Sequence, residues 1–209
     1  TYGLSRITVR RALRELAIDD LVQSVRGSGT YTKPLPLRQP IGGNVAEHLH
    51  FAEALSVKTT VRVLEFETVA PPLMVLQALC WPPTEMLHKV VRIRSYNRIP
   101  LSYVVSYVPP RLAKLYTRKA VTTGQSIVSM LQHKGVKIAS AQQTICASLA
   151  DPLVALELDV EVGSALLNIT RVMYDADGIG ISYLNVLYRS DRFQYQLPLA
   201  ANDREENPR

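Results

Sequence analysis

Basic side chains recur on one side of the first segment that has a helical pattern. Apolar side chains at Val9, Leu13 and Leu16 follow helical spacing from Ser5 to about residue 19, and Ser5 is a good N-cap. The opposite side carries guanidinium groups four residues apart, at Arg6, Arg10 and Arg14. Near the start of a helix such groups can enter the major groove of DNA and read guanine, while hydroxyls and backbone amides hold phosphates.

A short hairpin with a basic, glycine-rich tip follows this helix. Residues 21–25 read as a strand, Arg26-Gly27-Ser28-Gly29 as a tight turn, and residues 30–32 as the return strand. A glycine tip lets the backbone come close to phosphates or to the minor groove. This order is typical of the recognition helix and wing of a winged helix-turn-helix. The alternative is that the arginines form an ordinary solvated face of a surface helix. The wing and its spacing from the helix favour the DNA-binding interpretation over this alternative.

Charge is concentrated at the same end of the chain. Lysine and arginine together number 24 against 18 aspartate and glutamate, for a formal charge of +6. Seven basic and three acidic side chains lie between Thr1 and Arg38, so contact with a polyanion is plausible there. Because Thr1 is not an initiator methionine and the first element starts almost at once, we expect further sequence upstream.

The remainder predicts an α+β fold. Residues 33–40 contain three prolines in eight positions and cannot continue a helix or a central strand. We expect a partial DNA-binding domain at 1–33, a linker at 34–41, a second domain at 42–200 and a disordered tail at 201–209. In the second domain we expect strands at 61–69, 87–96, 100–108, 136–148, 164–175 and 179–188, and helices at 72–79, 124–134 and 152–158.

The second domain repeats itself at a constant offset of 80 in the numbering. The matches are Pro72 with Pro152, Leu73 with Leu153, Leu76 with Leu156, Ser102 with Ser182 and Tyr103 with Tyr183. Both the order of elements and the identities are preserved. We therefore predict two copies of a strand, a short helix and a hairpin, related by a pseudo-twofold axis and sharing one antiparallel sheet.

Two stretches resemble a known family of bacterial transcription regulators. Residues 3–16, followed by Asp20-Leu21-Val22 and by Arg-Gly-Ser-Gly-Thr at 26–30, resemble the second half of the winged helix of the GntR family, HutC branch. The rest resembles the UTRA domain, which has a chorismate-lyase-like fold. Its matching features are Arg92-x-Arg94, Pro100, Tyr107-x-Pro109, Ser126 before an amphipathic helix, and Tyr188-Arg189-x-Asp191-Arg192-Phe193.

The resemblance implies a ligand-responsive repressor that, as the intact protein, binds double-stranded operator DNA. Family members read two-fold operators, so a homodimer is expected. The positions implied to touch DNA lie at the helix start and at the wing: Ser5, Arg6, Thr8, Arg10, Arg26 and Gly27.

The resemblance also places a small effector between the halves of the repeat. Arg92, Arg94 and Ser126 would hold its anionic group, and Ser182 and Tyr188 would face its remainder. Two arginines alternating on one strand face suit a carboxylate or phosphate. The alternative is that both arginines pair with Glu65 or Glu67 on a neighbouring strand. Because Ser182 and Val104 replace acids common in the family, we expect a largely apolar or aromatic remainder.

Other classes of protein fit less well. A chorismate-lyase-like enzyme is the main alternative, although the sequence has no convincing set of acid–base residues. A third possibility is a pure interaction module. His48 and His50 could suit a metal, but no cysteine or carboxylate pair lies nearby, so neither a metal nor a cofactor is expected. With two cysteines, no signal peptide and no membrane span, we expect a cytoplasmic protein.

Overall fold

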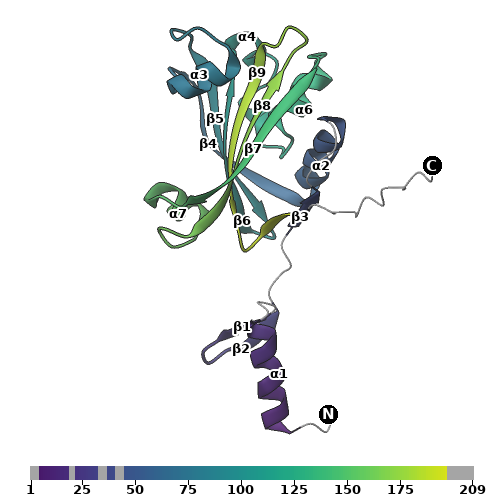
Figure 1. Ribbon diagram of the computed structural model, residues 1–209, viewed down its shortest axis with the longest axis vertical. Helices are drawn as coiled ribbons and strands as arrows, with labels where there is room; N and C mark the ends of the chain where they lie inside the picture. Colours follow the sequence, from purple (N-terminus) through teal and green to yellow (C-terminus); the bar gives the residue numbers. More distant parts are fainter. Residues whose placement is uncertain (1–4, 19–21, 33–36, 41–44, 197–209) are drawn as a thin grey trace, which may run out of the picture. The chain divides into compact units, whose positions relative to one another are not determined.

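The chain forms two compact units, Thr1–Leu37 and Arg38–Arg209. The computed structural model describes residues 5–18, 22–32, 37–40 and 45–196, and Figure 1 labels most of their helices and strands. The tail expected at 201–209 lies outside the described residues. No helix in these ranges has the length and apolarity needed to cross a bilayer.

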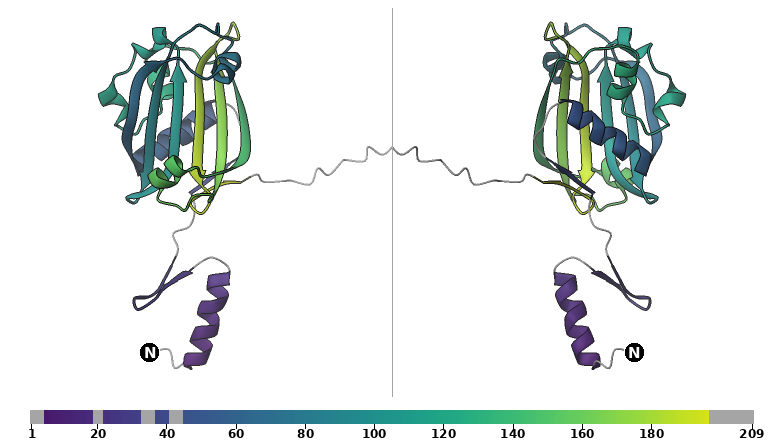
Figure 2. Two further views of the ribbon diagram at one scale, coloured as in Figure 1. Left: turned by 90° about the vertical axis from the view of Figure 1, so that its left-hand side faces the viewer. Right: turned by 90° about the vertical axis from the view of Figure 1, so that its right-hand side faces the viewer.

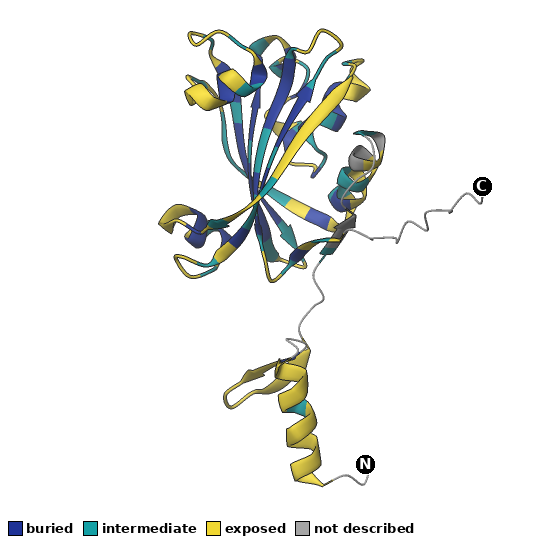
Figure 3. Cartoon of the chain, in the orientation of Figure 1, coloured by how far each residue is buried: buried dark blue, intermediate teal, exposed yellow. Residues whose placement is uncertain are grey.

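The described residues of the first unit form one helix and one hairpin, as the sequence predicts. Helix α1 spans Arg6–Ile18, and strands β1 (Val22–Val25) and β2 (Gly29–Thr32) pair antiparallel. The helix starts where expected because the Ser5 hydroxyl accepts a hydrogen bond from the Thr8 amide at 3.1 Å. None of the α1 side chains is buried, as the colouring of Figure 3 shows.

The second unit is built on a six-stranded sheet with the order β4-β5-β6-β9-β8-β7, in which the pairings are antiparallel (Figure 1). This large sheet confirms the predicted fold class. Its strands are β4 (Thr59–Val69), β5 (Leu87–Tyr96), β6 (Ile99–Val108), β7 (Ser140–Leu149), β8 (Ala165–Tyr174) and β9 (Gly180–Arg189).

Helices cover both faces of this sheet (Figure 2). On one face, α3 and α7 pack at opposite ends of the strands, against Tyr107 and Tyr183 for α3 and against Tyr103 for α7. On the other face, α6 packs against Val90 and Val108, and α2 lies beside α6. The helices are α2 (Val45–Lys58), α3 (Leu73–Leu79), α4 (Pro110–Ala113), α5 (Arg118–Val121), α6 (Ile127–His133) and α7 (Pro152–Leu158).

The pseudo-twofold repeat is present, with its axis between the two central strands. Val105 pairs with Asn185, and these two residues are equivalent at the predicted offset of 80. The pairs on either side, Val104 with Val186 and Ser106 with Leu184, exchange under the same operation. From either edge to the centre, the sheet has three strands in chain order, β4, β5 and β6 in one half and β7, β8 and β9 in the other. Each half therefore contributes a strand, a short helix and a hairpin.

The predicted offset is wrong by one position in the short helices. Buried Val75 and Leu79 of α3 correspond to buried Val154 and Leu158 of α7, so the offset between these helices is 79 rather than 80. Both helices then end on a left-handed residue, Cys80 and Asp159. In these helices, residues that are identical at an offset of 80 do not occupy equivalent positions, since Leu76 is 2% exposed and Leu156 is 78% exposed.

The proposed linker at 34–41 is too long. Leu37–Pro40 forms strand β3, which pairs with β10 (Phe193–Gln196) in a separate two-stranded sheet. A proline is tolerated here because each strand of a two-stranded sheet is an edge strand. Residues 33–36 and 41–44 lie outside the described ranges.

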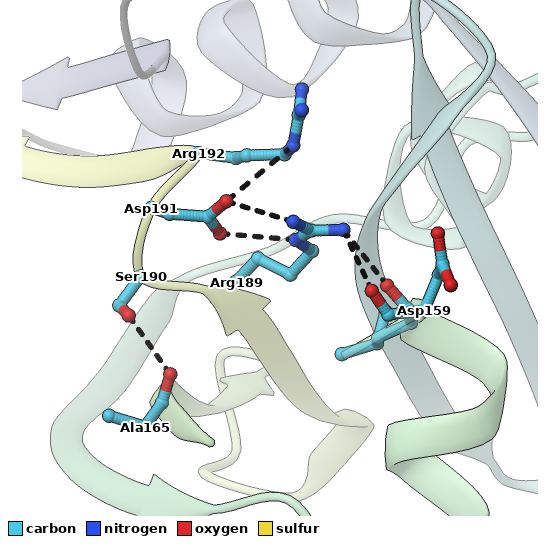
Figure 4. Close-up of polar contacts among 7 residues, drawn as sticks. Asp159, Ala165, Arg189, Ser190, Asp191 and Arg192 are labelled. Atoms are coloured by element: carbon cyan, nitrogen blue, oxygen red, sulfur yellow. Dashed lines mark hydrogen bonds and ion pairs between the residues drawn. The ribbon is translucent and has the colours of Figure 1, made fainter. Parts of the chain in front are cut away.

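Charged groups fix the chain where β9 leads into β10 (Figure 4). Arg189 donates hydrogen bonds to the carbonyls of Leu158 (3.1 Å) and Asp159 (3.3 Å), which lie at the end of α7, where carbonyls lack partners within the helix. Its other nitrogens meet Asp191 at 3.1 and 2.8 Å. Burial favours a higher pKa for Asp191, but the hydrogen bonds and positive charge of Arg189 outweigh burial and lower the pKa.

Candidate functional site

One cavity lies on the face of the sheet that α2 and α6 cover. It is open to solvent, and the empty space within it and at its mouth is about 810 Å³ in total. The residues that the sequence assigns to an effector all line it, so the structure brings together Arg92, Arg94, Ser126, Ser182 and Tyr188. They come from β5, β9 and the start of α6, segments far apart in the sequence.

Arg94 is buried at one end of this cavity. It is 7% exposed and donates hydrogen bonds to the Thr59 hydroxyl and to the Gly124 carbonyl, the latter at 2.7 Å. Gly124 has φ +89°, and a Cβ there would lie 3.0 Å from the Ser56 carbonyl oxygen. The glycine therefore lets the loop before α6 pass close to the end of α2.

Arg92 is buried beside Arg94 on the same strand face. It donates a hydrogen bond to the Gln125 carbonyl at 3.0 Å, while its Nε is buried without a hydrogen-bond partner among the described residues. Burial, with some repulsion from Arg94, lowers the pKa of Arg92 to about 9. The guanidinium therefore stays protonated at neutral pH, so this end of the cavity carries two positive charges.

Neither arginine makes the alternative ion pair with Glu65 or Glu67. The register places Arg92 opposite Val63 and Arg94 opposite Val61. A bulge between Val63 and Glu65 shifts the strand, and Glu65 pairs with Lys89 at 2.6 Å instead. The alternative was wrong because it assumed that an acid on the neighbouring strand would share the face of the two arginines.

The three hydroxyl residues differ in what they already bind. Ser126 caps α6, accepting a hydrogen bond from the Ser129 amide at 3.0 Å. Ser182 is buried at 2% exposure, and the ring of Tyr188 stacks on Phe193 with centroids 3.8 Å apart. Burial raises the pKa of Tyr188, so this hydroxyl stays neutral and can donate a hydrogen bond into the cavity.

The sequence analysis missed Arg171, a third buried arginine that lines the cavity. It lies on β8 opposite Leu184, just as Arg92 lies on β5 opposite Val104. Val104 and Leu184 are equivalent at an offset of 80, so Arg171 is the counterpart of Arg92 in the second half. Applying an offset of 79 to Arg92 on β5 would have found Arg171 on β8.

The cavity is strongly positive. Three arginines line it, and none of the described residues in its lining is an aspartate or glutamate. Most of the others are apolar, and the hydroxyl of Ser106 is buried without a hydrogen-bond partner in the part of the chain that the structure describes. Buried cations without a counter-ion are unfavourable, so the arrangement suits an anionic guest.

The second candidate surface is on α1 and the hairpin. Arg6, Arg10 and Arg26 are exposed, and Thr8 shares a hydrogen bond with Ser5 at 2.9 Å. Arg11 pairs with Glu15 at 3.1 Å, so the remaining arginines carry the free positive charge. Gly27 has φ +78°, which explains the glycine at the tip of the hairpin.

No metal site is indicated in the described ranges. His48 and His50 lie in α2, but the side chain of His48 is outside the described part of the structure. No cluster of three histidine, cysteine, aspartate or glutamate side chains is found among the residues that the structure places.

Known proteins match both units. Residues 1–32 match the gntR family of bacterial regulatory proteins, and residues 54–194 match the UTRA domain. The HTH-type transcriptional regulator Rv0792c of Mycobacterium tuberculosis is 30% identical over 94% of this chain and 73% of its own length. The HTH-type transcriptional repressor NagR of Bacillus subtilis is 25% identical over 93% of this chain and 79% of its own.

A solved structure supports the fold. PhnF from Mycobacterium smegmatis superposes with a TM-score of 0.67 at 23% identity, covering 96% of this chain and 87% of that one. Helix, wing and cavity-bearing sheet together define a bacterial transcription regulator of the helix-turn-helix class. The chain belongs to the GntR family, and its second unit is a UTRA domain of the HutC type. The matches are regulators, so the enzyme alternative finds no support.

Proposed function

We propose that the UTRA domain binds a small anionic metabolite in its cavity and thereby controls operator binding by the winged helix. The observation that carries this proposal is the pair of buried arginines, Arg92 and Arg94, facing a cavity whose described lining has no acidic side chain. The chain would act as a homodimeric repressor in the bacterial cytoplasm. Several relatives are named repressors, which favours that direction of control.

The chemistry of the lining defines the ligand further. Arg92 and Arg94 supply charge for a carboxylate or phosphate, with Ser126 beside them. Val104 and Ser182 replace acids that are common in the family, and such acids would bind hydroxyl or amine groups. The ligand should therefore be an acid with a largely apolar or aromatic remainder.

The fold offers a route from the cavity to the start of the domain. Tyr188 lines the cavity and stacks on Phe193, the first residue of β10, and Phe193 meets Phe51 of α2 edge to face at 6.5 Å. Strand β10 pairs with β3. A ligand that binds two arrangements of this sheet with different affinity would shift their populations, and operator affinity with them.

Arg94→Ala should abolish the response to the ligand. A screen of metabolic acids by thermal shift identifies a binder, which is then measured by calorimetry and by its effect on an operator gel shift. Losing a charge-assisted hydrogen bond should weaken ligand binding about tenfold or more, because such bonds contribute roughly 1.5–3 kcal/mol. Operator affinity without ligand should change little.

Two variants make this test specific. Arg94→Lys keeps the charge and should retain part of the ligand binding. Arg62→Ala removes an arginine that pairs with Glu157 outside the cavity, and it should leave ligand binding and the ligand response unchanged. The anion site is wrong if the best ligand is uncharged, or if the folded Arg94→Ala protein responds like the wild type.

A further inference from the structure

Arg171 is held in the cavity by a neutral partner. It is 7% exposed, and its Nε donates a hydrogen bond at 2.9 Å to the side-chain oxygen of Gln143, which also accepts from its Nη2. An amide orients a guanidinium but does not neutralise it. No carboxylate pairs with Arg171 among the described ion pairs.

The repeat sets Arg171 apart from the other two arginines. Arg171 lies on β8 and Arg92 on β5, and β6 and β9 lie between these strands. Three interstrand spacings amount to about 14 Å across the sheet, and the register also staggers the two arginines by two residues along the strands. The counterpart of Arg94 is Met173, so two arginines lie in one half of the cavity and one lies in the other.

The floor between these arginines is mainly apolar. The register places Val104 and Val186 opposite one another on the two central strands, with Leu184 next to Val186 on the same face. The phenol of Tyr188 lies close enough to both Arg94 and Arg171 to interact with each charge. The cavity therefore has a cationic patch in each half, and the stretch between the patches is apolar apart from the hydroxyls of Tyr188 and Ser106.

We propose that the effector carries two acidic groups separated by an apolar segment, with one group held by Arg92 and Arg94 and the second by Arg171. This inference rests on the proposed effector function and narrows its ligand class to dianions. A single acidic group could neutralise the paired arginines but would leave Arg171 buried without a counter-ion. The pseudo-twofold relation of Arg92 and Arg171 suits a ligand that is acidic at both ends.

The test compares matched acids by calorimetry on the purified chain. The probes are straight-chain α,ω-dicarboxylates and ω-phosphonocarboxylates of several lengths, each with the monocarboxylate and the ω-hydroxycarboxylate of the same carbon number. In the wild type, the best dianion should bind about tenfold or more tightly than its matched monoanion, as expected for one additional charge-assisted hydrogen bond.

Variants at Arg171 assign this preference to the side chain. In Arg171→Met, dianion and monoanion should bind within about twofold of each other, while Arg171→Lys should keep a preference for the dianion. Arg94→Ala should weaken both classes of acid. If Arg171→Met does not fold, the wild-type comparison and Arg171→Lys decide.

The outcomes separate this inference from the proposed function. Equal binding of monoanions and dianions, with both dependent on Arg94, overturns the second anion site and leaves the anionic effector intact. An ω-hydroxycarboxylate that binds as tightly as the dicarboxylate shows that Arg171 takes a neutral group, which also overturns it. A preference for dianions that persists in Arg171→Met also overturns the second anion site. If no acid of any series binds, both proposals fail.

Discussion

His88 is a buried histidine whose surroundings disfavour its charged form. The centroid of its ring lies 4.4 Å from that of the Phe66 ring and 5.6 Å from that of the Tyr116 ring. Its Nδ1 shares a hydrogen bond with the Tyr116 hydroxyl at 3.0 Å. Burial lowers the pKa of His88 below 6.5. Just below that pH the unfolded chain binds a proton here and the folded protein does not, so stability falls as pH falls.

Replacing His88 by phenylalanine should flatten this pH dependence. One proton contributes a slope of at most about 1.4 kcal/mol per pH unit, and the variant should lack that contribution between about pH 6.5 and the folded pKa. Urea unfolding of both proteins across this range measures the difference. Parallel stability curves would show that His88 does not titrate on unfolding.

The arginines of α1 should differ in their effect on operator binding. Arg6→Ala and Arg10→Ala should each weaken binding to the specific operator by roughly 1–3 kcal/mol for every hydrogen-bonded base that the side chain no longer reads. Arg26→Ala should act evenly across sequences if it touches phosphate. Arg11→Ala is the control, because Arg11 is already paired with Glu15. Unchanged gel-shift titrations for Arg6, Arg10 and Arg26 would remove the DNA-binding assignment of these residues.

Individual site residues were predictable where a motif marks them. The alternation of Arg92 and Arg94 on one strand and the position of Ser126 before a helix are visible locally, and all three line the cavity. Arg171 has no such local signal. Its position follows only from strand register, which depends on the length of the hairpin loop and on bulges rather than on the residue itself.

The same distinction applies to whole elements. The strands and hairpins of the large sheet were predictable, because alternation and turn residues recur in both halves. The short helices are displaced by one position relative to the predicted repeat, since burial rather than identity defines equivalence. Helix α2 was not predicted, and the β3–β10 pairing joins segments from opposite ends of the second domain's sequence, which no local pattern reveals.

The cap of α7 offers a test of one element. Asp151 accepts a hydrogen bond from the Val154 amide at 2.8 Å. In α3, the counterpart of α7, the N-cap residue is Pro72, which makes no side-chain hydrogen bond. Asp151→Ala should lower the free energy of unfolding by about 1 kcal/mol, while Asp151→Asn, which can still accept the bond, should lose only a few tenths. Denaturant unfolding measures both, and equal losses would contradict the capping role.

At the scale of the whole molecule, exposed apolar surface is unevenly distributed. In the first unit Ile7 and Ile18 of α1 are 81% and 77% exposed, so the described residues of this unit form little core of their own. In the second unit β7 is an edge strand whose side chains are mostly exposed, as Figure 3 shows, and Leu149 at its end is 69% exposed. Uncovered edges favour association with another chain.

We expect this edge to form a homodimer interface. A two-fold pair of UTRA domains is the simplest support for two winged helices on a two-fold operator. Light scattering on the purified chain at micromolar concentration should give twice the monomer mass of 23.3 kDa.

Substitutions on β7 test the location of the interface. Thr144→Lys combined with Cys146→Lys adds like charges to the exposed β7 of each protomer, and their repulsion across a two-fold interface should yield monomers. Leu153→Lys adds a charge at an exposed position of α7 and should leave the dimer intact. A monomeric wild type would contradict the dimer. A double variant that remains dimeric would show that the interface does not lie on β7. The next candidate would then be β4, because the six-stranded open sheet has β4 and β7 as its two edges.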